Sequence, residues 1–173
     1  MLGQPLADDS VSQILIDIDS PGGGVYGVSE LADEVTSARA QKPMVAIANS
    51  LAASASYWIG CSVSEFYVAP GGEVGSIAVW QAYFDYSQAF AAGGVKPTLI
   101  SAGKYKVEGN PCAPLDEEAQ GFMQSRLDDY YTSFTKVVAR GRAVPIAQVR
   151  DGMGQGRVLG ADAAYAQRAS EIL

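Results

Sequence analysis

The sequence predicts an α/β fold with a mostly parallel sheet, built as a single domain over residues 1–173. Two observations carry this prediction. Short β-branched runs alternate with segments of helical periodicity, which is the order expected of βαβ units with right-handed crossovers. The composition, 48% hydrophobic and 18% charged, is that of an ordinary globular protein with enough apolar residues for one core.

The first half of the chain supplies the predicted sheet. Residues 13–19 are a β-branched run that stops at Ser20-Pro-Gly-Gly-Gly24, which predicts a buried strand followed by a tight turn. Apolar residues at helical spacing predict a helix over residues 28–38. The other elements expected in this half are a helix within 51–61 and strands at 44–48, 65–69 and 74–79.

The pattern changes after Gly103. Residues 104–114 contain one glycine and two prolines, which predicts an ordered loop. Residues 115–140 begin with an acidic turn and carry an apolar stripe that includes Phe122 and Phe134, so they are expected to form the longest helix. A last helix is predicted over residues 161–171.

Composition and charge exclude several functions. Twelve Lys and Arg against nineteen Asp and Glu give a net charge of −7, which argues against a nucleic-acid partner because phosphates would be repelled. The chain has no histidine, which excludes a Ser-His-Asp triad and an HExxH zinc site. Cys61 and Cys112 lack metal-ligand spacing, so no metal and no cofactor is expected. No apolar run is long enough for a membrane span and no signal peptide is visible, so a soluble cytoplasmic protein is expected.

A glycine-rich turn is the first candidate for chemistry. Asp19-Ser-Pro-Gly-Gly-Gly24 follows a predicted parallel strand, and ligands of open α/β sheets bind at the carboxyl ends of strands. Glycines there let backbone N–H groups approach a ligand, which makes a cradle for an anion or an oxyanion. A plain structural turn is the alternative. Neither GxGxxG nor the Walker A pattern is present, so a phosphate loop is not predicted.

A serine and a nearby pair of lysines are the other candidates. Ser54 lies between a predicted strand and a short helix, where the helix dipole favours a developing oxyanion, although it could equally be only an N-cap. Without histidine, a serine nucleophile needs another base, and Gly103-Lys-Tyr-Lys106 supplies two lysines. To act as a base, a lysine must be desolvated until its pKa falls to about 7. Either lysine taken alone is also consistent with a solvated charge.

Five segments occur in the order and spacing of a known family, namely 16–24, 42–43, 52–58, 74–77 and 101–106. They resemble the signal peptide peptidase A family, and most closely its phage and prophage branch of capsid-maturation proteases. The resemblance covers roughly residues 10–165. It implies a ClpP/crotonase-like fold and a serine endopeptidase that uses a Ser/Lys dyad on a peptide or protein substrate.

The resemblance also implies roles for individual residues. Ser54 is expected to be the nucleophile and Lys106 the general base, with Lys104 the weaker candidate. The oxyanion hole would use backbone N–H groups of Gly23 and Ala55, with Gly22 supporting the turn. The residues expected to line the substrate groove are Gly24, Gly75, Ser76 and Ile77. Because relatives assemble as rings, we expect a homo-oligomer with active sites near subunit interfaces, in the cytoplasm and associated with phage procapsids.

The chain departs from the family pattern in several places. Family members carry further strands before residue 13, so the first strands of the fold are expected to be missing. Ala55-Ser56 stands where many members have Gly-Gly, and Ala78 replaces a usual glycine, which is expected to narrow the groove. Two other functions stay open. One is a crotonase-type acyl-CoA enzyme on the same fold, and the other is a truncated, inactive subunit that only builds an assembly or scaffold.

Overall fold

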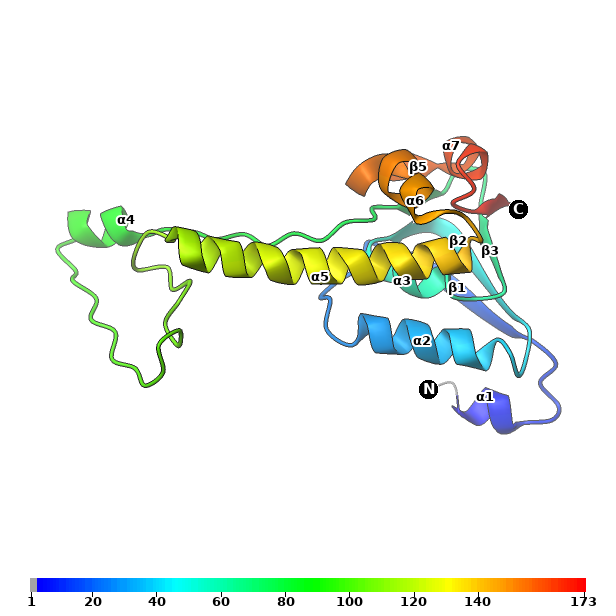
Figure 1. The fold of residues 1–173 in the computed structure, drawn as a ribbon. Coiled ribbons are helices and arrows are strands. Elements are labelled where there is room, and N and C mark those ends of the chain that lie inside the picture. Colours follow the sequence, from blue (N-terminus) through cyan, green and yellow to red (C-terminus); the bar gives the residue numbers. More distant parts are fainter. Residues whose placement is uncertain (1–2) are drawn as a thin grey trace. The chain divides into compact units, whose positions relative to one another are not determined.

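The computed structural model describes residues 3–173, which divide into two compact units (Figure 1). The first unit contains the chain up to residue 79 together with residues 130–173, and the second contains residues 80–129. Helix α5 (Glu117–Gly141) begins in the second unit and ends in the first. The expectation of one peptidase domain over residues 1–173 stays a prediction.

The first unit is built on a six-stranded, mostly parallel sheet, and this confirms the predicted fold class. Strand β2 lies at its centre and pairs in parallel with β1, β3 and β4. Strand β6 extends the sheet in parallel beyond β3, whereas β5 is antiparallel to β4. The strands are β1 (Ile14–Ser20), β2 (Met44–Ala53), β3 (Glu65–Val68), β4 (Glu73–Gly75), β5 (Val158–Gly160) and β6 (Glu171–Ile172).

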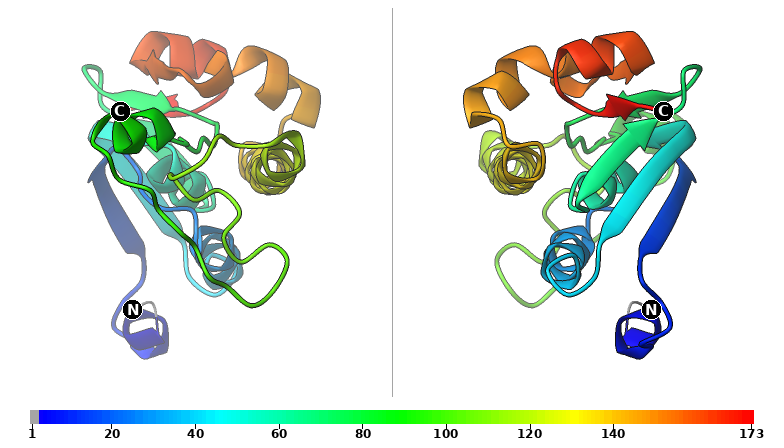
Figure 2. Two further views of the ribbon diagram at one scale, coloured as in Figure 1. Left: turned by 90° about the vertical axis from the view of Figure 1, so that its left-hand side faces the viewer. Right: turned by 90° about the vertical axis from the view of Figure 1, so that its right-hand side faces the viewer.

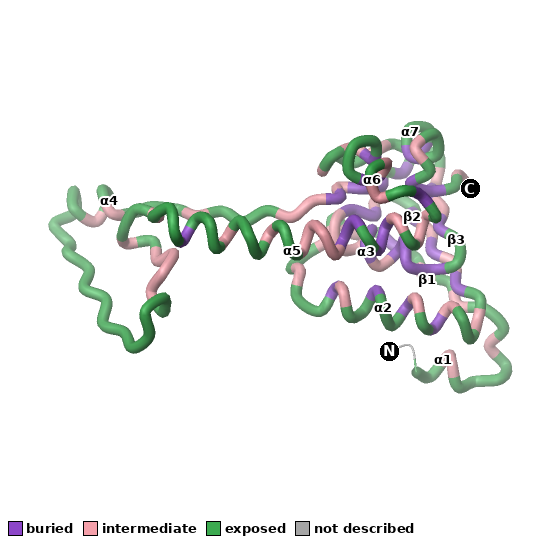
Figure 3. Tube along the Cα trace, viewed as in Figure 1, coloured by how far each residue is buried: buried purple, intermediate pink, exposed green. Residues whose placement is uncertain are grey.

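Helices α2 (Val28–Ala38) and α3 (Ala55–Gly60) cover one face of this sheet (Figure 2). The last part of α5 packs against them, and the Trp58 ring of α3 stacks on Phe134 of α5 with centroids 4.6 Å apart. Both side chains are buried. Figure 3, which colours the chain by burial, shows buried residues in purple around α3. The short elements of the unit are α1 (Gly3–Ala7), α6 (Ile146–Gly152), a 3-10 turn (Gly154–Gly156) and α7 (Ala161–Ala166).

Three element boundaries differ from the sequence prediction. The helix expected within 51–61 begins only at Ala55, because residues 51–53 continue β2 and pair with β4. The strand expected over 74–79 ends at Gly75, where positive φ angles at Gly75 (117°) and Ser76 (53°) turn the chain out of the sheet. The helix expected over 161–171 ends at Ala166, and the chain then forms β6 along the free edge of β3. The first and third differences follow from pairing between strands that are distant in sequence, and the second follows from the turn at Gly75 and Ser76.

The second unit contains α4 (Ser87–Ala92), the loop predicted over residues 104–114 and the first half of α5. Within residues 80–129, all of which the structure describes, Ala119 alone is buried. Phe122, predicted to belong to an apolar stripe, is 58% exposed. Eight large hydrophobic side chains of this unit are exposed, namely Trp80, Phe84, Tyr86, Val95, Leu99, Ile100, Tyr105 and Phe122. Among the helices of residues 3–173, none is long and apolar enough to cross a membrane.

Candidate active site

Ser54 occupies a strained turn between β2 and α3. Its backbone angles, φ 56° and ψ −123°, lie in a region that residues other than glycine rarely adopt. The turn is held from both sides, because the Ser54 N–H donates to the Gly75 carbonyl at 2.8 Å and the Ser54 carbonyl accepts from the Trp58 N–H at 2.9 Å. Although Ser54 stands at the N-cap position, its side chain makes no capping hydrogen bond. The hydroxyl is therefore not committed to stabilising the helix.

Ser56, two residues further on, has a different environment. Its hydroxyl lies 2.8 Å from the carbonyl oxygens of both Ser20 and Ala53, to which it can donate. These contacts join the start of α3 to the ends of β1 and β2. Ser56 thus serves the structure, whereas Ser54 keeps its hydroxyl available.

The glycine-rich turn lies directly against Ser54, and Gly22 makes this approach possible. A Cβ atom at Gly22 would lie 2.7 Å from the Ala53 carbonyl oxygen and 2.8 Å from the Ser54 Cβ, and the φ of Gly22 is 99°. The Gly22 N–H donates to the Ser20 hydroxyl at 3.2 Å. In contrast, a Cβ at Gly23 or Gly24 would have no neighbour within 4 Å. Only the first of the three glycines is required for packing.

The end of β4 and the residues that follow it lie next to Ser54. Gly75 pairs with Ala53 and accepts the hydrogen bond from Ser54, and the Ser76 N–H donates to the Arg157 carbonyl at 2.9 Å. Ser76 is half-buried, whereas the Ile77 side chain is fully buried in the core. Ile77 could therefore contact a ligand only through its backbone.

A pocket of about 20 Å³ lies beside Ser54, and none of the residues expected to line the substrate groove, namely Gly24, Gly75, Ser76 and Ile77, lines this pocket. Ser54, Ala55 and Gly23, expected to provide the nucleophile and the oxyanion hole, all line it. Backbone N–H groups are strong donors, so Gly23 and Ala55 have the chemistry needed to hold a carbonyl oxygen beside the Ser54 hydroxyl. Ala78, which was expected from the sequence to narrow the groove, also lines the pocket. The other lining residues, which the sequence did not single out as a site, are Val25, Val28, Trp58, Val79 and Phe134.

The two candidate lysines belong to the second unit and have different environments. The Lys104 ammonium donates to the Tyr105 hydroxyl at 2.7 Å and to the Glu118 carboxylate at 3.2 Å. These two hydrogen bonds, the first being the larger cause, raise the pKa of Lys104. The Lys106 side chain is exposed, and its backbone N–H donates to the Gly103 carbonyl at 3.2 Å. The first unit thus brings together Ser54, Gly22, Gly23, Ala55 and Gly75, while Lys106 stands in the other unit.

The remaining ionisable groups offer little further chemistry. Across residues 3–173, no group of three or more histidine, cysteine or acidic side chains could hold a metal ion. Cys61 and Cys112 are free thiols, and burial raises the pKa of Cys61 to about 12. The sheet-face residue Asp17 accepts a hydrogen bond from the Asn49 amide at 2.6 Å.

The chain is similar in sequence to known proteins. The sequence model of peptidase family S49 matches residues 36–170. The head-tail preconnector protein GP5 of Enterobacteria phage P21 is 38% identical over 138 residues, which are 80% of this chain and 28% of that protein. The capsid assembly protease C of Escherichia phage lambda is 35% identical over 150 residues, which are 87% of this chain and 34% of that protein. The chain therefore spans about a third of the length of these two relatives.

A solved structure shares the fold. A mutant of the 1510-N membrane-bound stomatin-specific protease, determined with a substrate peptide, superimposes with a TM-score of 0.57. The match covers 95% of this chain and 61% of that chain at 17% sequence identity.

Proposed function

This chain belongs to peptidase family S49, and from that premise we propose that it is a serine endopeptidase with Ser54 as the nucleophile and Lys106 as the general base. The observation that carries the proposal is the Ser54 turn. A strained residue at a strand-to-helix turn, with a hydroxyl that makes no capping bond and a pocket beside it, is the arrangement expected of a nucleophile.

The proposed reaction has two halves. The neutral Lys106 amine accepts the proton of the Ser54 hydroxyl while the Ser54 Oγ attacks the carbonyl carbon of a peptide bond. Backbone N–H groups of Gly23 and Ala55 donate to the resulting oxyanion. The lysine then gives its proton to the leaving amine as the C–N bond breaks. A water molecule, activated by the same amine, hydrolyses the acyl-enzyme and restores the serine.

Lys106 is favoured over Lys104 because the two amines have different partners. A general base must lose its proton, and the contacts of Lys104 with Tyr105 and Glu118 stabilise the charged form. No comparable contact holds the side chain of Lys106 within residues 3–173. This difference supports the assignment that the family resemblance implies.

We propose that assembly completes the site. A lysine acts as a base when it is removed from water, but the Lys106 side chain is exposed in the single chain. The second unit also exposes eight large hydrophobic side chains, and a large exposed apolar surface is typical of a protein interaction site. A homo-oligomer that covers this unit would desolvate the lysine near a subunit interface.

The substrate is proposed to be a protein of an assembling phage capsid. This rests on two relatives, named as a capsid assembly protease and a head-tail preconnector protein. On the same ground we propose that the protein acts in procapsids.

The test is labelling by a fluorophosphonate probe together with cleavage of a denatured protein, in four variants of the assembled protein. Ser54→Ala should abolish both signals and Lys106→Ala should abolish cleavage. Ser56→Ala, the matched serine control, should keep the label, and Lys104→Ala should keep most of the cleavage. A label that survives Ser54→Ala and disappears with Ser56→Ala would refute the assignment. Unchanged procapsid maturation in Ser54→Ala would indicate an inactive scaffold subunit.

A further inference from the structure

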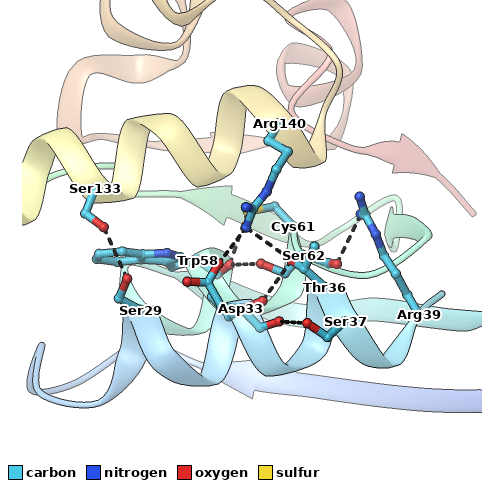
Figure 4. Close-up of polar contacts among 11 residues, drawn as sticks. Ser29, Asp33, Thr36, Ser37, Arg39, Trp58, Cys61, Ser62, Ser133 and Arg140 are labelled. Carbon is cyan, nitrogen blue, oxygen red and sulfur yellow. Dashed lines mark hydrogen bonds and ion pairs between the residues drawn. The ribbon is translucent and has the colours of Figure 1, made fainter. Parts of the chain in front are cut away.

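The pocket beside Ser54 is small because large side chains close it. Trp58 and Phe134 are both buried, and their rings stack with planes only 5° from parallel. The hydroxyls of Ser29 on α2 and Ser133 on α5 share a hydrogen bond of 3.2 Å, drawn together with Trp58 in Figure 4. Arg140 of α5 also donates to the Asp33 carboxylate of α2 at 2.8 Å. Helices α2 and α5, which supply Val28 and Phe134 to the pocket, are therefore joined by hydrogen bonds. These two residues cannot readily move apart to admit a larger group.

Ala78 also lines the pocket. Its N–H donates to the Ser76 carbonyl at 2.9 Å, which forms a tight turn after β4. A Cβ at Gly156 would lie 3.1 Å from the Ala78 Cβ, so the Gly154–Gly156 turn packs directly behind this side chain. Ala78 is therefore held in place against the pocket that it lines.

From these contacts we propose that the pocket receives the substrate side chain that precedes the scissile bond, and that it admits alanine or glycine but excludes larger residues. Val28, Ala78 and Phe134 are then the residues that determine specificity. The proposal rests on the proposed function, because the residue whose carbonyl Ser54 attacks must place its side chain beside Ser54. A volume of about 20 Å³ accommodates one group of about the size of a water molecule, which a methyl group matches and an isobutyl or benzyl group exceeds.

The apolar lining agrees with this substrate class. Apart from the Ser54 hydroxyl, the side chains around the pocket are hydrocarbon or aromatic, and none carries a charge. A charged side chain would lose its hydration there without gaining a partner. Each additional methylene on the substrate side chain should lower the rate of cleavage, relative to a substrate without it, by about tenfold or more.

The experiment is digestion of a peptide library with the assembled protein, followed by mass-spectrometric identification of the residue before each cleaved bond. Alanine and glycine should dominate in the wild type. Val28→Ala and Ala78→Gly should each raise cleavage after valine or leucine, relative to alanine, by about tenfold. Leu31→Ala, on the same helix as Val28 but outside the pocket, should leave the ratio unchanged. The ratio compares substrates on one enzyme sample, so it does not depend on how much of a variant is folded.

Two different failures can be told apart. If cleavage depends on Ser54 but occurs mainly after leucine, phenylalanine or charged residues, the pocket assignment is wrong and the proposed function stands. The same holds if both pocket variants keep the wild-type ratio. If no cleavage depends on Ser54, the proposed function itself is refuted, and the pocket assignment with it.

Discussion

Replacing Gly22 with alanine tests how closely the glycine-rich turn must approach the Ser54 turn. In the native structure the new methyl group would lie 2.7 Å from the Ala53 carbonyl oxygen and 2.8 Å from the Ser54 Cβ. Both neighbours belong to the turn that carries the proposed nucleophile, and neither is the mobile end of a long side chain. The variant must therefore move one of the two turns.

The expected cost has two sources. A φ of 99° is unfavourable for a residue with a Cβ by about 1–2 kcal/mol. Relieving the two short contacts adds a strain comparable to overpacking a core, again about 1–3 kcal/mol. Together they lower the free energy of unfolding by about 3 kcal/mol, which for a chain of this length lowers the melting temperature by roughly 6–12 °C. Displacement of Ser54 should also slow fluorophosphonate labelling by about tenfold or more.

The assay compares Gly22→Ala with Gly24→Ala by thermal unfolding and by the labelling rate. Gly24 is a matched control in the same turn, because its Cβ would have no neighbour within 4 Å and its φ is not positive. We expect Gly24→Ala to melt like the wild type, and its labelling rate to fall less than that of Gly22→Ala. Wild-type melting and labelling of Gly22→Ala would refute the argument that this glycine positions Ser54.

Three further predictions concern stability and reactivity. Gly141→Ala should be severely destabilising in urea unfolding, because its Cβ would overlap the Cys61 carbonyl. Gly121→Ala in the same helix is the control, because its Cβ faces open space, and it should raise the free energy of unfolding by up to about 1 kcal/mol. With a thiol-reactive reagent at pH 8, native protein should react at Cys112 and not at Cys61, which is buried and has a pKa of about 12; two equally fast thiols would contradict this. The unfolded chain ionises Cys61 near its ordinary pKa of 9.0 and the folded chain does not, so the free energy of unfolding should fall as the pH rises from about 9 to 12, and Cys61→Ala should reduce this slope.

Local patterns were sufficient for most of the elements. The β-branched run before Ser20 and the helical spacing after Val28 predicted β1 and α2 within about a residue. They failed where partners distant in sequence decide the outcome. Residues 51–53 belong to a segment rich in alanine and serine, which suggested a helix. Their pairing with β4 keeps them in the sheet instead. The strand at Glu171–Ile172 likewise depends on the free edge of β3.

The candidate site shows the same division. Residue chemistry alone excluded imidazole bases, and the order of motifs pointed to Ser54, the glycine-rich turn and a lysine. Local composition does not separate Ser54 from Ser56, because both are serines among alanines, and only the family resemblance favoured Ser54. Their environments differ through contacts with Ser20 and Gly75, which reach them across the sheet.

The amino-acid sequence by itself determined three features: a parallel α/β framework, the absence of an imidazole, and the small residues that let the glycine-rich turn contact the Ser54 turn. Only the tertiary structure decided which glycine is indispensable, which serine keeps an uncommitted hydroxyl, and how much space lies beside it. The physical reason is that torsional strain and close packing depend on atoms brought together from four separate segments. Val28, Ala78 and Phe134 come to line one pocket only after the sheet and its helices have formed.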